Sequence, residues 1–390
     1  MSDRPNSDPP KLSPILGLPV DDELLRTVPS AATETARVTP MGEEVRFELS
    51  VIIPARNEER NLPVCLESLL VQDSTLFPLG TDWELIVVDD HSTDRTRAIA
   101  QEAAAKHEGV HVLEAPSLAA TQGAFTGKTN ACWFGAQHAR GRWLLFTDAD
   151  TVHEPNDLRH ALHEAEKYQA ALLSYSPRQI VSGPAQRALM PLIFSELASV
   201  YPPADVNDPN KRTAAANGQF LLVERGAYFA IGGHRAVGGS VLEDVDLAWN
   251  MKRAKRTIRF RYAPDALSTR MYRGFGDMVE GWTKNLALLF PHALRLAAWR
   301  ALDVLLLLLP LLIWLLPYLV LWQRAAIVLL WLRTVIRFYT RVARSHFGFV
   351  NCALSIFGIP LFILLLVRSW MQHHLFHQVA WKGRAYHTDR

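Results

Sequence analysis

Residues 142–151 read Arg-Trp-Leu-Leu-Phe-Thr-Asp-Ala-Asp-Thr, and this stretch decides how the rest of the chain is interpreted. The apolar run 143–146 has the length of a buried β-strand. We expect the strand to stop at Thr147 and to place Asp148 and Asp150 at its carboxyl end, where open α/β sheets bind ligands. Two acids one residue apart suit a divalent cation that also holds phosphate oxygens. A solvated acidic turn is the structural alternative.

The composition indicates a soluble domain joined to a membrane part. The chain has 390 residues, enough for one large or two modest domains, and much of its apolar content follows residue 301. A formal net charge of +2 does not suggest nucleic-acid binding. The three cysteines are scattered, which predicts buried thiols rather than a disulfide framework or a zinc site. Without an apolar run of signal-peptide length at the N-terminus, the soluble part is expected to stay in the cytoplasm.

Strands and helices are predicted to alternate after a polar leader. Residues 1–46 are rich in Pro, Ser, Thr and acids and are expected to be disordered or loosely docked. Apolar runs then predict strands at 49–53, 83–88, 110–113, 143–146, 170–175 and 258–262. Helical patterns lie between most of them, which implies a mostly parallel, doubly wound α/β sheet.

Three acidic clusters occur in a fixed order along the chain: Asp89-Asp90, Asp148-x-Asp150 and Glu243-Asp244. The first pair can accept N–H and O–H groups of a base or ribose. The second can hold a metal ion on a diphosphate. The third follows a glycine-containing stretch and can supply a general base. Lys128 precedes the predicted strand 143–146, which leads to Asp148, and it is placed to reach phosphate or ribose.

Each of these residues also has a structural interpretation. Asp89 would cap a helix, and Lys128 would be a solvated loop lysine. Glu243 would make a structural hydrogen bond, which leaves Asp244 as the better base. The stretch Asn217-Gly218-Gln219 would either line an acceptor site or make a turn.

Together, the motifs resemble those of the family 2 glycosyltransferases, whose catalytic domain has the GT-A fold. The resemblance covers roughly residues 48–290. The matching segments are Ile52-Ile53-Pro54-Ala55-Arg56-Asn57-Glu58, Val87-Val88-Asp89-Asp90-His91-Ser92-Thr93-Asp94, Gly127-Lys128, Asp148-Ala149-Asp150 and Glu243-Asp244-Val245-Asp246. Any one of these segments is unspecific by itself, but the presence of all of them in this order makes the resemblance strong. The resemblance implies a GT-A-type doubly wound mixed sheet followed by C-terminal transmembrane helices.

The resemblance also implies roles for individual residues. Donor-binding positions would be Pro54, Arg56, Glu58, Asp89, Asp90, Lys128 and Asp148, with the two acids Asp89 and Asp90 on the uridine side. Asp148 and Asp150 would form the DxD motif that holds Mg²⁺ or Mn²⁺ and the diphosphate. Asp244 would deprotonate the acceptor hydroxyl.

The C-terminal third predicts a membrane part. Residues 273–300 mix aromatic, basic and apolar groups and are expected to lie in the membrane interface. The stretches 301–322 and 347–367 are apolar over about the length of a membrane span. Whether 301–332 form one tilted helix with an extension or a tight hairpin stays open. The predicted domains are therefore 1–46 (leader), 47–272 (catalytic), 273–300 (interfacial), 301–370 (transmembrane) and 371–390 (basic tail).

One departure from the family pattern bears on the product. Processive relatives that polymerise cellulose, chitin or hyaluronan carry Gln-x-x-Arg-Trp after the base. Here the corresponding region reads Glu280-Gly281-Trp282-Thr283-Lys284-Asn285. Trp282 and Lys284 would supply a ring and a cation on the acceptor side, but the polymerase signature is absent. The segment, the spans and the ending 381–386 resemble instead membrane-bound bacterial carotenoid and hopene-associated glycosyltransferases.

The sequence therefore predicts a membrane-bound inverting glycosyltransferase. It would move a single sugar from a nucleotide-diphosphate sugar, with a UDP-sugar as the expected donor, to a lipid acceptor such as a carotenoid or hopanoid. It would be multi-pass in the cytoplasmic membrane, with the catalytic domain facing the cytoplasm. Two alternatives stay open: a processive polysaccharide synthase, and a catalytically inactive nucleotide-sugar-binding membrane scaffold.

Overall fold

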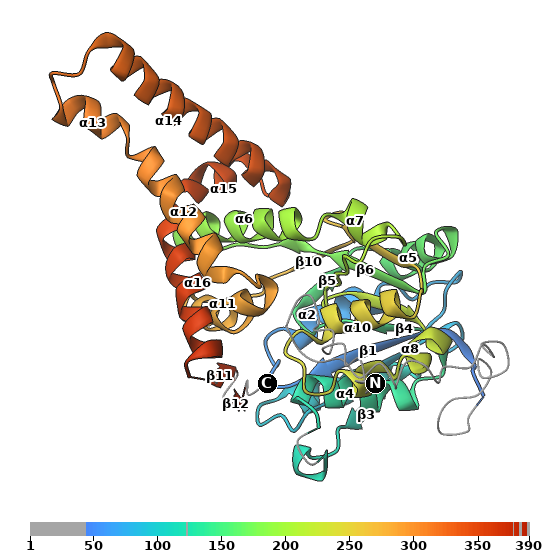
Figure 1. Cartoon of the computed structure of the whole chain (residues 1–390). Helices are drawn as coiled ribbons and strands as arrows, with labels where there is room; N and C mark the ends of the chain where they lie inside the picture. Colours follow the sequence, from blue (N-terminus) through green and yellow to red (C-terminus); the bar gives the residue numbers. More distant parts are fainter. Residues whose placement is uncertain (1–43, 122–123, 377, 382–383, 388–390) are drawn as a thin grey trace, which may run out of the picture. The chain divides into compact units, whose positions relative to one another are not determined.

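The computed structural model describes residues 44–121, 124–376, 378–381 and 384–387 (Figure 1). Nearly all of the predicted leader, and part of the predicted basic tail, lie outside these residues. The chain forms two compact units. Among the described residues, the sheet unit comprises 44–180 and 201–271, and the helical unit comprises 181–200 and everything from 272 onward.

A seven-stranded mixed sheet forms the centre of the sheet unit, in the order β3-β2-β1-β4-β8-β6-β9. Its strands are β1 (Phe47–Ala55), β2 (Trp83–Asp89), β3 (Val110–Glu114), β4 (Gly141–Phe146), β6 (Leu172–Ser176), β8 (Leu221–Glu224) and β9 (Ile258–Tyr262). The first four run parallel, and β8 lies antiparallel between β4 and β6. The GT-A-like mixed α/β sheet that the sequence predicts is confirmed.

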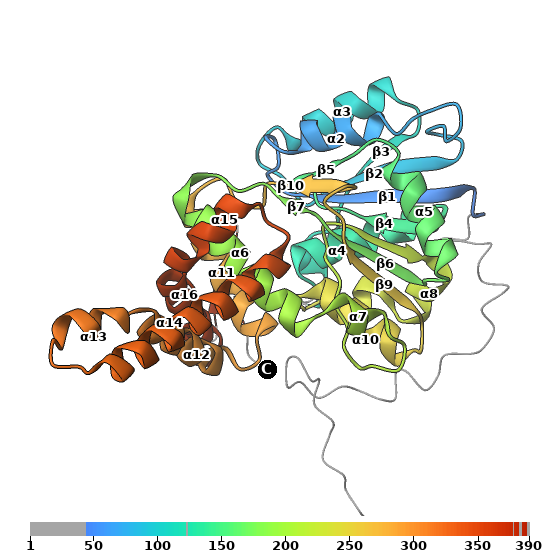
Figure 2. The same cartoon turned by 90° about the horizontal axis from the view of Figure 1, so that it is seen from above.

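Helices cover both faces of this sheet (Figure 2). They are α2 (Leu62–Leu70), α3 (Thr96–Lys106), α4 (Gly127–His138), α5 (Asp157–Lys167), α7 (Pro203–Asn207), α8 (Arg225–Ala230), α9 (Gly233–Ala236) and α10 (Glu243–Arg253). Alternate residues of β1 face opposite ways: Val51 and Ile53 join the core with α2, α3 and α5. Ile52 faces α4, where a Cβ on Gly135 would lie 2.7 Å from its Cγ2. Glycine therefore lets α4 pack closely against the sheet.

A small second sheet follows the acidic turn after β4. It consists of β5 (Thr151–His153), β10 (Leu267–Thr269) and β7 (Arg178–Gln179), with β10 in the middle. β10 pairs antiparallel with β5 and parallel with β7. This pairing holds the chain in place directly after the Asp148–Asp150 turn.

The helical unit is built around α16. Its elements are α6 (Gly183–Val200), α11 (Phe275–Leu289), α12 (Ala293–Leu307), α13 (Pro310–Leu315), α14 (Leu321–Val342), α15 (Phe349–Leu354), α16 (Ile359–His374), and a hairpin of β11 (Gln378–Trp381) and β12 (Arg384–His387). The Ser369 hydroxyl of α16 accepts a 2.8 Å hydrogen bond from the Ala287 amide of α11. Residues 359, 362, 366, 369 and 373 of α16 are buried, which is the spacing of one helix face.

The predicted membrane spans at 301–322 and 347–367 have different outcomes in the structure. Of the two arrangements left open for residues 301–332, the structure has the hairpin: α12 and α13 form one arm and α14 returns as the other (Figure 1). Among the described residues, one helical segment, Phe349–His374, is long and apolar enough to cross a membrane.

Candidate active site

A pocket in the sheet unit brings together residues from distant parts of the chain. It is lined by Pro54, Lys128, Cys132, Phe146, Thr147, Asp148, Gly218, Leu221, His234, Glu243 and Asp244. The predicted site residues Pro54, Lys128, Asp148, Gly218, Glu243 and Asp244 are all among them. They come from the ends of β1 and β4, the first turns of α4 and α10, and the turn before β8. The pocket therefore lies at the carboxyl ends of parallel strands, where the sequence placed it.

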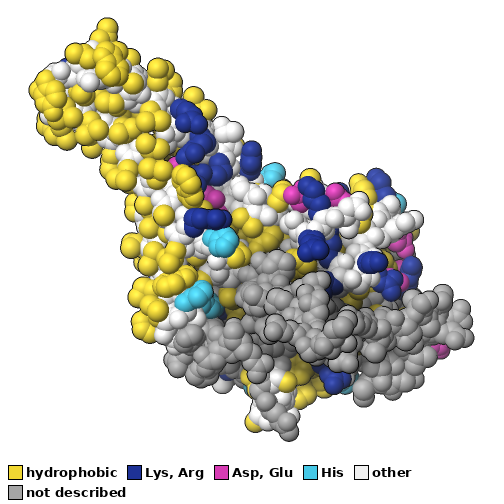
Figure 3. Space-filling view, viewed as in Figure 1, with side chains coloured by type: hydrophobic (Ala, Val, Ile, Leu, Met, Phe, Trp, Pro, Cys, Tyr) yellow, Lys and Arg dark blue, Asp and Glu magenta, His cyan; other side chains and the backbone are white. Residues whose placement is uncertain are grey.

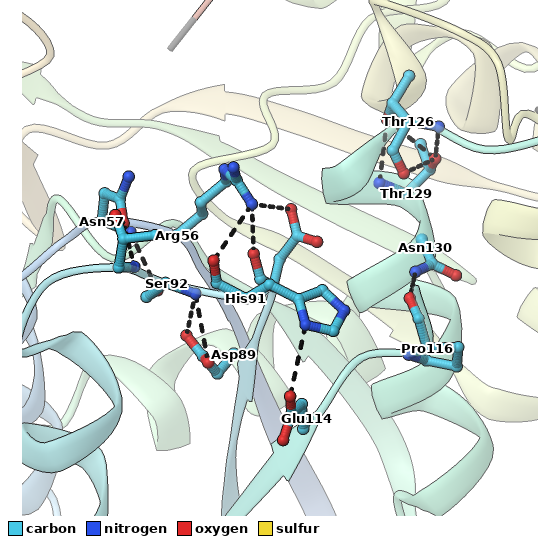
Figure 4. A network of polar contacts seen from close by, with 12 residues as sticks. Arg56, Asn57, Asp89, His91, Ser92, Glu114, Pro116, Thr126, Thr129 and Asn130 are labelled. Atoms are coloured by element: carbon cyan, nitrogen blue, oxygen red, sulfur yellow. Dashed lines mark hydrogen bonds and ion pairs between the residues drawn. The ribbon is translucent and has the colours of Figure 1, made fainter. Parts of the chain in front are cut away.

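Lys128 links two carboxylates across this pocket. Its Nζ lies 2.8 Å from Asp148 Oδ1 and 2.9 Å from Glu243 Oε1. A capping box sets the first turn of α4: the Thr126 hydroxyl accepts from the Thr129 amide at 3.2 Å, and the Thr129 hydroxyl accepts from the Thr126 amide at 2.9 Å (Figure 4). Desolvation opposes the charge of Lys128, but the carboxylates of Asp148 and Glu243 hold its pKa well above the ordinary value.

Gly218 fits closely against this ion pair. A Cβ at this position would lie 2.9 Å from Lys128 Nζ and 3.5 Å from both Asp244 Oδ2 and Glu243 Oε1. The backbone amide of Gly218 also donates a 2.7 Å hydrogen bond to Asp244 Oδ2. Glycine thus allows the backbone to approach both the lysine and the acid.

Asp244 is oriented by two backbone amides. Besides the bond from Gly218, its Oδ1 accepts a 2.8 Å hydrogen bond from the Val245 amide in the first turn of α10. Desolvation and the neighbouring charge of Glu243 raise the pKa of Asp244 to about 7, although Lys128 and both amide bonds oppose the shift. A carboxylate with a pKa near neutrality is well matched to accept a proton from a substrate hydroxyl.

The turn that carries Asp148 and Asp150 is held at several points. The buried Thr147 hydroxyl donates to the Gln219 carbonyl at 2.8 Å and lies 3.1 Å from His153 Nε2. The Thr269 hydroxyl of β10 donates to the Asp150 carbonyl at 3.2 Å. Burial raises the pKa of the Cys65 thiol, and the charges of Asp150 and Asp148 raise it further, so both acids lie near this one thiol.

These two acids fit a hard divalent cation of the Mg²⁺ or Mn²⁺ type. Within the described parts of the chain, no group of three or more His, Cys, Asp or Glu side chains forms a complete metal site. Mg²⁺ commonly needs only one or two protein carboxylates, because substrate phosphates and water supply its other oxygen ligands. The side chain of Asp148 is 26% exposed, so an oxygen ligand remains accessible from the pocket.

The predicted nucleotide side consists of residues after β1 and β2 (Figure 4). Arg56 Nη1 donates to the Asp90 carbonyl at 2.7 Å and lies 3.8 Å from the Asp90 carboxylate. The Asp89 carboxylate accepts a 3.3 Å hydrogen bond from the Ser92 amide, which closes a turn rather than capping α3. Glu58 accepts from the Asn61 side chain at 2.7 Å. The structure thus places Arg56 and Asp90 together, and gives Asp89 and Glu58 local partners.

The predicted acceptor-side residues divide between the two units. Asn217 Oδ1 accepts from the Gln219 amide at 3.0 Å, so these two make a turn that presents Gly218 to the pocket. Trp282 and Lys284 belong to the helical unit. The Trp282 ring is 3% exposed, and its Nε1 lies 3.3 Å from Met190 Sδ. This indole therefore fills the core of the helical unit.

The sequence assigns no role in the site to several pocket residues, and it favours a structural role for His234. His234 is 2% exposed, and its Nδ1 lies 2.9 Å from the Tyr228 hydroxyl. Burial lowers the pKa of His234 to about 3, so the imidazole is neutral at physiological pH. Thr147 and Cys132 are equally inconspicuous in the sequence. The glycines before His234 are the only local signal, and they indicate a turn rather than a site.

Comparison with known proteins assigns the family. The model of glycosyl transferase family 2 matches residues 50–228. A 4,4'-diaponeurosporenoate glycosyltransferase of Staphylococcus haemolyticus is 30% identical over 374 residues, which cover 88% of this chain and 89% of the relative. The chain belongs to glycosyl transferase family 2. It is therefore a glycosyltransferase, and the matched range covers most of the sheet unit together with α6 of the helical unit.

Other proteins are similar to this family 2 glycosyltransferase over comparable lengths. A Staphylococcus aureus protein that is also named 4,4'-diaponeurosporenoate glycosyltransferase is 26% identical over 352 residues. Among solved structures, a mannosyltransferase from Pyrobaculum calidifontis, in complex with GDP-Man and Mn²⁺, has a TM-score of 0.48 and 17% identity. That match covers 84% of this chain and 87% of the mannosyltransferase.

Proposed function

We propose that this family 2 glycosyltransferase is membrane-bound and moves one sugar, with inversion, from a nucleotide-diphosphate sugar to a lipid acceptor. One observation carries the proposal. A candidate base, Asp244, and a candidate donor-side acid, Asp148, face the same pocket, and Lys128 connects Asp148 to Glu243, the neighbour of Asp244. Inverting transfer in a single displacement needs one base on the acceptor side and charge stabilisation on the leaving-group side.

On the acceptor side, Asp244 would take the proton of the attacking hydroxyl group. The Gly218 and Val245 amides, at 2.7 and 2.8 Å, hold the Asp244 carboxylate in one orientation. This fixed orientation supports its role as base, because proton transfer requires the base within hydrogen-bond reach of the acceptor. Glu243 would contribute through Lys128, whose ammonium it holds at 2.9 Å.

On the donor side, Asp148 and Asp150 would hold a divalent cation, either Mg²⁺ or Mn²⁺. When bound, that cation supplies positive charge for the leaving diphosphate. Lys128 provides a second positive charge at 2.8 Å from Asp148. We place the nucleotide, with UDP as the expected one, beside Pro54, Arg56 and the Asp89-Asp90 pair. The Arg56 guanidinium lies 3.8 Å from the Asp90 carboxylate, so these two charged groups would meet the nucleotide together.

Two observations support a lipid acceptor. The named relatives are 4,4'-diaponeurosporenoate glycosyltransferases, and the acceptor in that name is a lipid-like carotenoid. The helical unit also contains a segment, Phe349–His374, that is long and apolar enough to cross a membrane. We therefore propose that the protein works at the cytoplasmic membrane, with the sheet unit on the cytoplasmic face.

The experiment that tests this proposal is lipid mass spectrometry. Lipids from cells that express the wild-type chain are compared with lipids from cells that express Asp244→Asn at the same level. We expect one or more lipids to gain the mass of a single sugar in the wild-type cells only. A ladder of masses would indicate a processive synthase, and identical lipid profiles would indicate a scaffold; either result would refute the proposal.

A further inference from the structure

The hairpin of α12, α13 and α14 exposes an apolar surface. Residues 304–332 include no buried residue. Their most exposed side chains include Trp314 at 81%, Leu321 at 84% and Trp322 at 70%. Apart from the Tyr318 hydroxyl, the polar side chains of the segment are Gln323 and Arg324. In Figure 3 the hairpin is a nearly unbroken hydrophobic surface. A continuous exposed apolar surface over this many residues indicates an interaction site.

A basic cluster lies at the base of this hairpin. It consists of Arg300 and Asp303 on α12, Arg337 and Arg341 on α14, and Glu196 on α6. Asp303 pairs with Arg300 at 2.7 Å and with Arg337 at 2.6 Å, which ties the two arms together. Arg341 Nε lies 3.3 Å from Glu196.

The charge balance of the basic cluster is positive, because three arginines face two acids. The side chain of Arg337 is 51% exposed, whereas that of Asp303 is 3% exposed. Two more arginines, Arg333 before Arg337 and Arg344 after Arg341, are also exposed. Lys and Arg side chains gather at this end of the hydrophobic surface in Figure 3. Guanidinium groups beside an apolar surface are complementary to the phosphates above a lipid leaflet.

The length of the hairpin limits how deep it reaches. Residues 321–332, the apolar part of α14, span about 18 Å at 1.5 Å per residue. The hydrocarbon core of a bilayer is about 30 Å thick. This arm can therefore reach only slightly past the middle of the bilayer. At the turn, Arg324 donates to the carbonyls of Pro317 and Leu319 at 2.7 and 2.9 Å. These bonds pair carbonyl groups that hydrocarbon would leave without a donor.

We propose that the α12–α14 hairpin enters one leaflet of an anionic phospholipid bilayer and turns back without crossing it. The basic cluster then lies at the level of the lipid phosphates, and the tip around Trp314 and Trp322 lies in the hydrocarbon. This inference rests on the membrane-bound part of the proposed function. It is independent of donor, acceptor and sugar transfer, so its tests use no activity measurement.

Cysteine labelling in sealed proteoliposomes tests the depth. In a Cys352→Ser background, Leu315→Cys reports the tip, and Ser74→Cys, an exposed position of the sheet unit, is the control. An impermeant maleimide should label Ser74→Cys from one side and Leu315→Cys from neither side until detergent is added. Labelling of the tip from the side opposite to Ser74→Cys would mean that the hairpin crosses. Labelling from the same side would mean that it is not inserted. Either result would overturn the proposal.

Vesicle flotation tests the lipid. The wild-type chain should bind vesicles that contain phosphatidylglycerol more tightly than vesicles of phosphatidylcholine alone. Arg337→Gln should weaken binding to the anionic vesicles about fivefold, while Arg337→Lys retains it, because each basic side chain at the surface attracts anionic lipid. In the wild-type chain Asp303 also pairs with Arg300 at 2.7 Å, so we expect neither variant to leave this acid without a partner. Arg142→Gln, which removes an exposed charge from the sheet unit, is the matched control.

Three results would contradict the assignment to anionic lipid. The first is equal binding to both kinds of vesicle, and the second is an equal loss in Arg142→Gln. The third concerns a second copy of this chain as the occupant of the hairpin surface. If Leu315→Cys forms disulfide-linked dimers in lipid-free buffer and these persist without binding vesicles, the surface is a protein interface instead.

Discussion

The sheet unit and the helical unit each hold a cluster of ionised side chains, and the two clusters have opposite charge balance. In the pocket of the sheet unit, Lys128 faces the carboxylates of Asp148, Glu243 and Asp244. In the helical unit, three arginines face Asp303 and Glu196. The first cluster therefore has an excess of acid and the second an excess of base.

This difference matches the two proposed roles, sugar transfer in the sheet unit and membrane binding at the hairpin. An excess of acid in a pocket attracts a divalent cation, which can in turn bind a diphosphate. It also raises the affinity of a carboxylate for protons, which suits a general base. A basic excess beside an apolar surface favours phosphates. Exposure differs in the same sense: the Asp148 side chain is 26% exposed to incoming ligands, whereas the Asp303 side chain is 3% exposed and holds arginines in place.

Removing the donor-side acids should have the largest effect. Asp148→Ala or Asp150→Ala should reduce sugar transfer to background, because the charge of the leaving diphosphate would no longer be offset. EDTA should have the same effect on the wild-type enzyme, and Mg²⁺ or Mn²⁺ should restore it. Transfer is measured with radiolabelled UDP-sugar. Undiminished transfer by Asp150→Ala in EDTA would remove these residues from the mechanism.

Asp244→Asn keeps the size of the side chain and removes the proton acceptor. Transfer should fall about a hundredfold or more, the scale of general-base catalysis, while UDP-sugar binding in the presence of metal stays unchanged. Calorimetry and initial rates measure the two quantities. Asp246→Asn, in the same helical turn, controls for the lost charge. Loss of donor binding in Asp244→Asn would place this acid in the donor site instead.

Asp303→Asn tests the structural character of the basic cluster. Breaking a buried ion pair by removing one partner costs about 3 kcal/mol, so the variant should unfold at a clearly lower temperature in detergent. UDP-sugar affinity should not change, because the pocket lies in the other unit. Glu280→Gln, an exposed acid on α11, is the control. A normal melting temperature for Asp303→Asn would show that the arginines do not depend on this acid.

The pH dependence follows from the raised pKa of Asp244, about 7. Only the deprotonated form of Asp244 accepts a proton, so the rate constant for transfer should rise with pH and level off above about 7. Below that pH it should fall about tenfold per unit, as expected for one essential ionisation. The profile is measured at saturating donor and metal. A rate that stays constant between pH 5 and 8 would be inconsistent with Asp244 as the base.

Gly218→Ala should have the smallest effect. Its Cβ would lie 2.9 Å from Lys128 Nζ, the end of a flexible side chain, so Lys128 can move aside. We expect a severalfold loss of transfer with a folded protein, because the lysine no longer holds Asp148 and Glu243 together. Gly226→Ala, where a Cβ meets nothing within 4 Å, is the matched control. Equal activity of both variants would show that the Lys128 position is unimportant.

Much of the sheet unit could be predicted from the sequence. Buried parallel strands appear as short apolar runs, and the polar residues after β2 and β4 mark the strand ends. These signals are local, because side-chain burial and turn formation depend on neighbouring residues. The acids at 89–90 and 148–150 therefore lie at or just after strand ends, as the sequence predicts, and the order of the three acidic clusters predicted the family.

The C-terminal part was less predictable. The apolar stretch 301–322 has the composition of a span, but Pro310 and the turn at 316–320 divide it between α12, α13 and α14. Hydropathy measures composition, and it does not determine whether a chain continues or reverses. Trp282 reads as an interfacial ring in the sequence, yet Met190, far away along the chain, contributes to its burial.

By itself, the sequence determined the strands, the acidic strand ends and the family, because periodicity and turn chemistry are properties of adjacent residues. Only the tertiary structure decided how the charges pair. Lys128 meets Glu243, the Gly218 amide meets Asp244, and Asp303 meets Arg337 through contacts between residues that are far apart along the chain. Such contacts depend on how the elements pack, and no local pattern encodes their distances. The same packing raises the pKa of Asp244 to about 7, because the burial of Asp244 and its closeness to the Glu243 charge exist only in the folded pocket.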